Sequence, residues 1–304
     1  MKNTQKVVSN KIRTTPATVT FNIIAYILIT ILALFCVLPF IMMISGSFTA
    51  EQTIRFEGYS ILPRDVTLEA YEVIFRIPEK IIRAYGVSIF ITAVGVLIGL
   101  FVLTMTAFVI SRKDFKYRNV LSFFFYFTTL FNGGILSTYI FYIRYYNLKN
   151  NIIALILPGI MNVFYLLIMR SFITALPASL VESAKIDGAG EFRIFVQIIL
   201  PLIKSGLATI GLFIALGYWN DWYNAMLYME NEKLYPLQYM LYDLQMRQQG
   251  LSQIASQAGI RVENLPSNSL KLAMAVVATG PIIFLYPFVQ KYFVKGITIG
   301  SVKG

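Results

Sequence analysis

Side chains able to perform catalysis are scarce in this chain of 304 residues. It contains no histidine, which excludes a histidine general base and the histidine-containing zinc sites. Its one cysteine, Cys36, lies in an apolar run and can form neither a disulfide within the chain nor a thiolate metal site. The phosphate-cradling pattern GxxxxGK(S/T) is absent, so the chain cannot hydrolyse ATP by a P-loop mechanism. We therefore expect a protein that is not an enzyme and that itself binds no cofactor and no metal.

A different kind of site is indicated by the segment 176–202, where small residues separate two apolar patterns of helical period. Pro177 suits the first turn of a helix, Gly188 suits a terminating residue with positive φ, and Pro201 disfavours unbroken helix. The apolar positions are Leu180, Val181 and Ala184 before Gly188, then Phe192, Phe195, Val196 and Ile199. This pattern predicts a helix, a hinge and a second helix. The first helix is either a rigid knob for a protein partner or an interfacial helix in lipid headgroups, and composition leaves both readings open.

The elements that must position this segment are membrane spans. The chain is 57% hydrophobic and 13% charged, with a mean hydropathy of +0.66, unlike a soluble globular domain. A helix needs roughly 20 apolar residues to cross a bilayer. Six runs without Asp, Glu, Lys or Arg meet or approach this length: 21–44, 86–110, 119–141, 151–169, 205–220 and 272–290. In a soluble helical bundle, six charge-free runs of such length would have to occur by chance. The sequence therefore predicts an all-α polytopic membrane protein with six transmembrane helices.

Basic residues predict the orientation of these spans. If the N-terminus is cytoplasmic, the inner segments 1–20, 111–118, 170–204 and 291–304 carry 15 Lys and Arg against 4 acids. The rest of the chain carries 11 of each sign, so the whole formal charge of +11 lies on one side. The positive-inside rule then places both termini in the cytoplasm. The expected organisation is a cytoplasmic segment 1–20, a transmembrane domain 21–290 and a cytoplasmic tail 291–304.

One spaced pattern within 176–202 resembles a known motif. Glu182-Ser183-Ala184, three residues, Gly188, nine residues, Ile198, one residue and Leu200-Pro201 resemble the EAA loop of permease subunits in ATP-binding-cassette (ABC) importers. Ser183 stands where alanine is usual. Further segments are similar to the carbohydrate-uptake branch, in particular to its maltose-permease-like smaller subunit and the variety that works beside a lipoprotein-type binding protein: 147–150 before 154–158, 186–189, 219–221 and 290–296.

The resemblance implies a type I ABC importer permease fold with a cytoplasmic coupling helix, in the bacterial cytoplasmic membrane. It implies a second permease subunit, two ATPase subunits that hold ATP and Mg, an extracytoplasmic sugar-binding protein and an oligosaccharide substrate. Glu182 is then expected to contact the ATPase, Ala184 and Gly188 to permit its close approach, and Asp187 and Ala189 to fix the loop. The residues expected to couple to the ATPase are Glu182, Ser183, Ala184, Asp187, Gly188, Ala189 and Pro201.

Candidates for a substrate path are polar groups placed inside or at the ends of spans. Asn132 precedes two glycines in the third run, and Asn162 lies in the fourth. Tyr218, Trp219, Asn220 and Asp221 close the fifth run. Amides and a carboxylate there can hydrogen-bond sugar hydroxyls, and aromatic faces can stack on sugar rings. The alternative reading is ordinary packing between helices, including amide hydrogen bonds to a neighbouring helix.

For two regions outside the predicted spans, the sequence leaves two interpretations open. The outer loop 224–269 either meets the binding protein or packs as a lid on its own permease, and the tail 291–304 either touches the ATPase pair or anchors on anionic lipid. Rival functions are an importer for peptides, polyamines or phosphate, an intramembrane enzyme and a gated channel. The six runs lack ionisable groups, which argues against a proton-coupled carrier. An enzyme would need convergent carboxylates, whereas only Asp221 stands at the end of a run.

Overall fold

The structure is a computed structural model that describes residues 15–257 and 267–300. Within these residues the secondary structure is helical apart from one isolated β-bridge between Thr49 and Val66, which confirms the all-α prediction. Parts of the predicted N-terminal segment, outer loop and tail, namely 1–14, 258–266 and 301–304, lie outside the described residues.

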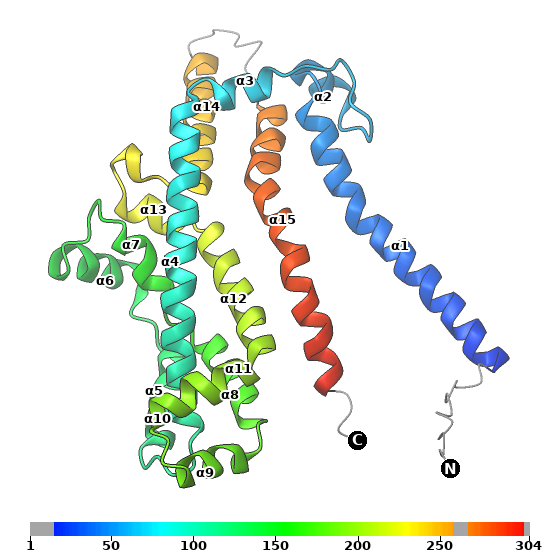
Figure 1. The fold of residues 1–304 in the computed structure, drawn as a ribbon. Coiled ribbons are helices and arrows are strands. Elements are labelled where there is room, and N and C mark those ends of the chain that lie inside the picture. The colour runs from blue at the N-terminus through cyan, green and yellow to red at the C-terminus, as the bar shows by residue number, and fades with distance from the viewer. Residues whose placement is uncertain (1–14, 258–266, 301–304) are drawn as a thin grey trace.

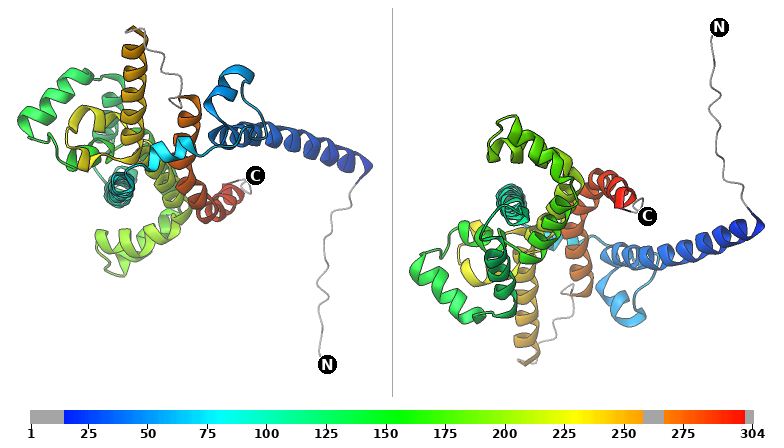
Figure 2. Two further views of the ribbon diagram at one scale, coloured as in Figure 1. Left: turned by 90° about the horizontal axis from the view of Figure 1, so that it is seen from above. Right: turned by 90° about the horizontal axis from the view of Figure 1, so that it is seen from below.

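Two predicted spans are uninterrupted helices. α1 (Pro16–Ser47) contains the run 21–44, and α4 (Pro78–Ser111) contains the run 86–110. Figures 1 and 2 show α1 diverging from the other long helices along its length. No residue of its most apolar stretch is buried within the chain, as expected for a helix whose apolar side chains face lipid or another subunit.

Two other predicted spans are not single straight helices. The run 119–141 is divided between α5 (Arg118–Leu130) and α6 (Gly134–Ile140), which continues as a π-helical turn (Phe141–Tyr145), and the two parts meet at 112°. Gly134 has φ +81° and donates its N–H to the Asn132 Oδ1, so the Asn-Gly-Gly sequence forms a turn.

The run 151–169 is also broken, between α7 (Ile153–Ile156) with its 3-10 continuation (Leu157–Gly159) and α8 (Val163–Thr174). These two parts meet at 52°. Pro158 and Gly159 interrupt the helix, and the Asn162 side chain starts the next one by accepting the backbone N–H groups of Phe164 and Tyr165. The absence of charged residues predicted both spans, but it could not show where each span bends or by what angle.

The remaining runs are helical. The run 205–220 corresponds to α12 (Lys204–Trp219), which meets the preceding helical stretch Glu191–Leu202 at 84°, in agreement with the prediction that Pro201 disfavours unbroken helix. The run 272–290 lies in α15 (Asn268–Gly300), which continues into the predicted tail. The predicted outer loop is itself largely helical, with α13 (Tyr223–Tyr228), a 3-10 turn (Glu232–Leu234) and α14 (Leu237–Gln257).

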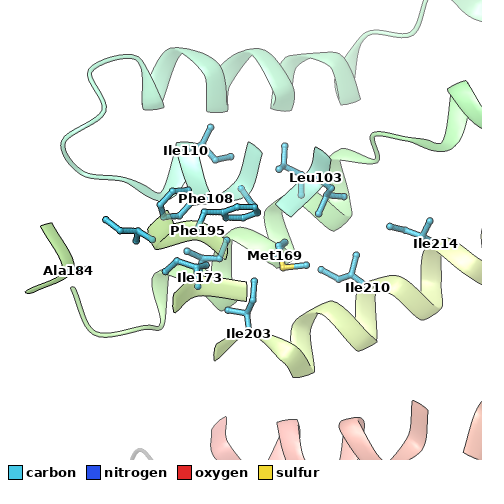
Figure 3. Packing of buried hydrophobic residues seen from close by; sticks show 14 of the residues in the cluster. Leu103, Phe108, Ile110, Met169, Ile173, Ala184, Phe195, Ile203, Ile210 and Ile214 are labelled. Atoms are coloured by element: carbon cyan, nitrogen blue, oxygen red, sulfur yellow. The ribbon is translucent and has the colours of Figure 1, made fainter. Parts of the chain in front are cut away.

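Helix α4 is the centre of the packing. Its C-terminal half joins α8 and α12 in one apolar cluster that includes Leu103, Met169 and Ile210, all fully buried (Figure 3). Its N-terminal half packs with α14 and α15 through a second cluster around Leu237 and Leu270. Figure 1 shows α9 (Ala178–Ile186) at the end of the molecule where α1 begins and α15 finishes.

The opposite end of the molecule is held together by short helices. There α3 (Glu69–Phe75) lies beside α14, and α2 (Glu51–Glu57) lies beside the start of α15 (Figure 1). The Glu51 carboxylate accepts the backbone N–H groups of Asn268 and Ser269, at 2.8 and 3.0 Å. A carboxylate at a helix N-terminus satisfies free N–H groups and complements the helix dipole, so α2 fixes the start of α15.

Candidate functional site

The 176–202 segment folds as the sequence predicts, with a glycine at the turn. Helix α9 begins after Pro177 and ends in a Schellman motif. Gly188 donates its N–H to the Lys185 carbonyl at 3.0 Å, and Ala189 donates to the Ala184 carbonyl at 2.9 Å. Gly188 has φ +77°, which confirms the predicted terminating residue. The second helical stretch comprises α10 (Glu191–Ile194), a π-helical turn (Phe195–Ile199) and α11 (Leu200–Leu202).

Most of the predicted coupling residues are open to a partner. Glu182, Ser183, Asp187, Gly188 and Pro201 are exposed, and Ala189 is half-buried. No atom outside the local chain lies within 4 Å of a Cβ placed on Gly188, so the surface over the turn is unobstructed.

Ala184 requires a correction. Its side chain is only 8% exposed and belongs to the apolar cluster formed with α4 and α8, at whose edge Figure 3 shows it. The small side chain therefore permits α9 to approach the chain's own helices, not a partner. A residue that the sequence reasoning missed is Ile186, which is 86% exposed. The sequence contained a signal for this residue, because Ile186 does not belong to the apolar set of α9 (Leu180, Val181 and Ala184). An isoleucine outside that set is an apolar side chain that the helix presents to solvent.

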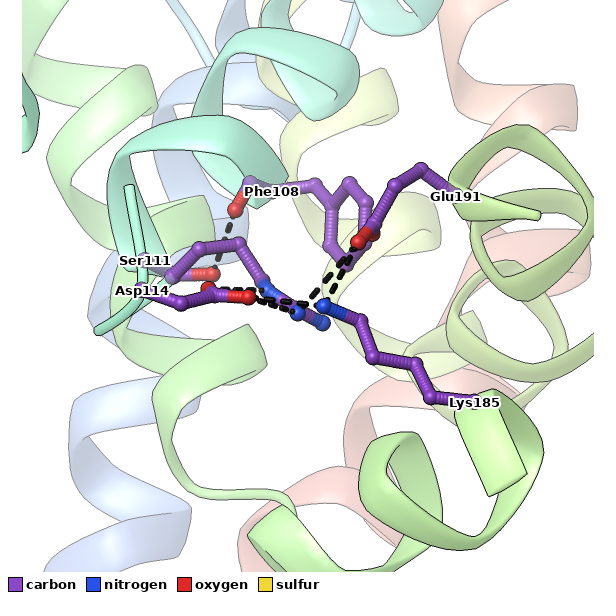
Figure 4. Close-up of polar contacts among 6 residues, drawn as sticks. Phe108, Ser111, Asp114, Lys185 and Glu191 are labelled. Carbon is purple, nitrogen blue, oxygen red and sulfur yellow. Dashed lines mark hydrogen bonds and ion pairs between the residues drawn. The ribbon is translucent and has the colours of Figure 1, made fainter. Parts of the chain in front are cut away.

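A cluster of four charged side chains ties α9 to the end of α4 (Figure 4). Arg112 follows the last residue of α4 and pairs with Asp114 at 2.7 Å and with Glu191 at 3.4 Å. Lys185 on α9 pairs with Asp114 at 2.7 Å and with Glu191 at 2.8 Å. No motif or spacing in the sequence indicated this cluster, because its two halves are about 70 residues apart and meet only through the fold.

The pKa shifts of the cluster follow from these contacts. Hydrogen bonds from Arg112 and Lys185 hold the pKa of the Asp114 carboxyl well below its ordinary 3.8, and hydrogen bonds to Asp114 and Glu191 raise the pKa of Lys185. The stabilisation from Asp114 is complete above its ordinary pKa and is lost only as pH falls through the lowered one. That from Lys185 is complete below its ordinary pKa and is lost as pH rises through the raised one. Both remain intact across the neutral range.

A second site lies where the fourth predicted span breaks. It is a cavity of about 310 Å³ that opens between the break at 159–162 and the end of α12. It is distinct from a first cavity of about 380 Å³ that adjoins α9. The structure brings three predicted substrate-path residues to the second cavity, namely Asn162, Tyr218 and Asp221. Tyr165 and Phe213, which sequence reasoning did not single out, also line it, with their rings parallel and 6.0 Å apart.

Tyr218 forms a buried wall of this cavity. Its hydroxyl donates to the Ile156 carbonyl at 2.6 Å, a carbonyl next to the Pro158 break. A Cβ on Gly159 would lie 2.7 Å from the Tyr218 hydroxyl oxygen, and a Cβ on Gly95 would overlap the Tyr218 ring. Both glycines are therefore needed for the ring to fit between α4 and the break.

The other predicted path residues have separate roles. Trp219 is buried and donates its indole N–H to the Ala278 carbonyl of α15 at 3.0 Å, which corrects its assignment to the path. Asn220 is exposed and accepts a hydrogen bond from Gln238. Asn132 belongs to the α5–α6 turn and does not line this cavity. The Asp221 carboxylate accepts both the backbone and side-chain N–H groups of Asn224.

The structure thus has long apolar helices, some of them broken, and an exposed helix–glycine–helix segment at one end, which is the arrangement that the resemblance to importer permeases implies. The chain belongs to the family of binding-protein-dependent transport system inner membrane components, whose family model matches residues 95–299. Permeases of this family work with ATPase subunits, a partner permease and a substrate-binding protein.

Three similar proteins narrow the class. Protein LplC of Bacillus subtilis (strain 168) is 41% identical over 270 residues, covering 88% of this chain and 90% of that protein. The polygalacturonan/rhamnogalacturonan transport system permease protein YtcP of the same organism is 37% identical, covering 93% and 98%. A solved bacterial ABC transporter involved in the import of the acidic polysaccharide alginate matches with a TM-score of 0.75 and 27% identity, covering 92% of this chain and 99% of that one.

These comparisons confirm the resemblance stated from the sequence. The chain is an ABC importer permease and a multi-pass membrane protein, and it is a transport component rather than an enzyme.

Proposed function

We propose that the chain is one of two transmembrane subunits of an ATP-driven importer for oligosaccharides, forms half of the translocation pore and receives ATPase motion through α9. The observation that carries this proposal is the exposed turn at Gly188, at the end of a helix that the Lys185–Asp114 ion pair links to the segment directly after α4. ATP and Mg are held by the separate ATPase subunits, and an extracytoplasmic binding protein of the lipoprotein type delivers the sugar. A knob joined rigidly to membrane helices converts displacement of its partner into movement of the pore.

The proposal places both chain ends and α9 in the cytoplasm. Support comes from the excess of Lys and Arg on these segments and from the common end at which α9, the start of α1 and the end of α15 lie. The helix α14 and the turn before it then face the binding protein.

Topology and uptake test this proposal together. In a Cys36→Ser background, a membrane-impermeant maleimide is expected to label Ile186→Cys only in inverted vesicles and Glu230→Cys only in right-side-out vesicles. The complete complex in proteoliposomes should take up sugar only when ATP is present. Uronate-containing oligosaccharides should be assayed first, because relatives are named for polygalacturonan, rhamnogalacturonan and alginate. Labelling of Ile186→Cys from outside, or uptake without the ATPase, contradicts the proposal.

We also propose that the cavity beside Asn162 is this chain's part of the sugar path. It combines an aromatic wall, Tyr165 and Phe213, with the polar groups of Asn162 and Asp221, the mixture that a sugar ring with hydroxyls requires. Its position at a broken span is favourable, since irregular backbone at membrane depth is tolerated where it lines a cavity.

Replacing Phe213 tests this cavity. Phe213→Leu is expected to raise the half-saturation concentration for uptake by roughly tenfold, because a stacking surface for the sugar is lost. Phe124→Leu, at an exposed phenylalanine of α5 outside the cavity, serves as the control and should transport normally. An unchanged half-saturation concentration in Phe213→Leu would exclude the cavity from the path.

A further inference from the structure

We propose that Arg112 is the positioning residue that joins the 176–202 segment to α4, so that displacement of α9 is passed into the central membrane helix. This inference rests on the proposed function and assigns the connection to a particular side chain. No motif marks Arg112, and the resemblance to the EAA loop begins 70 residues further along the chain.

The geometry of Arg112 is that of a fixed joint. Its Nε and Nη2 atoms donate to the two carboxylate oxygens of Asp114 at 3.0 and 2.7 Å, a bidentate arrangement that fixes the plane of the guanidinium group. Nη2 also donates to Glu191 at 3.4 Å. The Arg112 side chain is only 14% exposed, whereas its carboxylate partners are more than half exposed. The guanidinium carbon lies 5.6 Å from the centre of the Phe108 ring, so α4 supports the group from beneath.

The four ion pairs fall into three kinds of link. Asp114–Lys185 and Arg112–Glu191 cross from the segment after α4 to α9 and α10, respectively. Lys185–Glu191 spans the turn at Gly188 and Gly190, and Arg112–Asp114 is local to the end of α4. If Arg112 is removed, Lys185 alone faces both carboxylates, and the ion pair between α10 and the end of α4 is lost.

An isolated surface ion pair usually contributes little to the stability of a fold. This cluster differs because its central cation is largely buried, its geometry is bidentate, and each of its four groups contacts two others. The apolar contact between Phe108 and Phe195, 5.6 Å between ring centres, lies in the core nearby and keeps α4 and the second helical stretch packed. Loss of Arg112 should therefore loosen the joint while the fold persists.

The first experiment compares transport with ATP hydrolysis in the complete reconstituted complex. Arg112→Ala is expected to assemble and to hydrolyse ATP. The amount of sugar transported per ATP hydrolysed should fall by about fivefold or more, which is the factor that a typical coupling between two sites produces. Lys113→Ala removes one cation from the neighbouring position outside the cluster and should keep the wild-type ratio. Only complexes that elute intact on gel filtration are compared, so that a failure of assembly is not counted as loss of coupling.

A charge exchange then separates the link across the turn from the links to α4. The double variant Lys185→Glu with Glu191→Lys keeps opposite charges across the turn but makes both contacts with Arg112 and Asp114 repulsive, so its transport per ATP should fall as in Arg112→Ala. Adding Arg112→Glu and Asp114→Lys restores opposite charges in all four pairs, and the ratio should recover. A structural role confined to the turn would leave the double variant unaffected.

The outcomes are distinguishable from failure of the proposed function. If the wild-type complex shows no ATP-driven sugar uptake, the proposed function fails. If the wild type and Lys113→Ala transport, and either Arg112→Ala or the double variant keeps the wild-type ratio, only the role of Arg112 is overturned. The same holds if the quadruple variant transports no better than the double variant.

Discussion

A Gly188→Asp variant is expected to insert into the membrane normally and to lose ATP-driven sugar uptake, with the ATPase either dissociated or uncoupled. Two physical effects combine at this position. The backbone has φ +77°, a conformation that costs an L-residue roughly 1–2 kcal/mol, or about tenfold in population. The new carboxylate also lies beside Asp187 on the exposed surface proposed to meet the ATPase. Normal uptake by an inserted Gly188→Asp protein would defeat the coupling assignment.

A matched pair of valine substitutions isolates the backbone effect. Gly188 and Gly190 both have open space around an added Cβ, but Gly190 has φ −69° and ψ 158°, which valine adopts readily. Gly188→Val should therefore reduce uptake strongly, and Gly190→Val should retain it. Uptake is measured in proteoliposomes alongside ATPase retention on affinity purification. Equal loss in both variants would show that bulk on this surface, not the terminating turn, is what matters.

A Gly95→Ala variant is expected to be destabilised by about 1–3 kcal/mol, the usual cost of overpacking a close contact. The added methyl group would overlap the Tyr218 ring, which sits between α4 and the helix break at 159–162. Displacing the ring breaks the hydrogen bond to the Ile156 carbonyl, and a buried carbonyl without a partner costs about 1–3 kcal/mol. The measurement is the melting temperature of the purified chain in detergent.

Gly86→Ala is the control for this substitution. Gly86 lies on the same helix, but a Cβ there has no neighbour within 4 Å. Alanine favours helix over glycine by up to about 1 kcal/mol, so this variant should melt at or above the wild-type temperature. If Gly95→Ala melts as high as Gly86→Ala, then Tyr218 does not require the close approach that the structure shows.

Local patterns predicted elements well where the deciding interactions are local. Gly188 illustrates this, because a helix that ends with a left-handed residue favours glycine there whatever surrounds it. The broken spans are the reverse case. Both 119–141 and 151–169 are free of charged residues, and the length of such a run alone cannot distinguish one straight helix from two short ones that meet at 112° or 52°.

The roles of individual site residues show the same division. Ala184 and Trp219 have types that suit a contact surface, yet both are buried against other helices of the chain. Which face of a short helix is buried depends on where α4, α8 and α15 lie, and a single sequence with no partner helix cannot supply that information.

From its sequence alone the chain is determined to be an all-helical membrane protein with a helix–glycine–helix segment, because apolar length and a terminating glycine act along the chain, and the permease class was implied by the resemblance of that segment to the EAA loop. The tertiary structure alone decided that Arg112 and Asp114 meet Lys185 and Glu191, and that Asn162, Tyr218 and Asp221 line one cavity. These contacts join segments that are about 60 to 80 residues apart. Only the packing of α4 against α8, α9 and α12 sets the distances on which they depend.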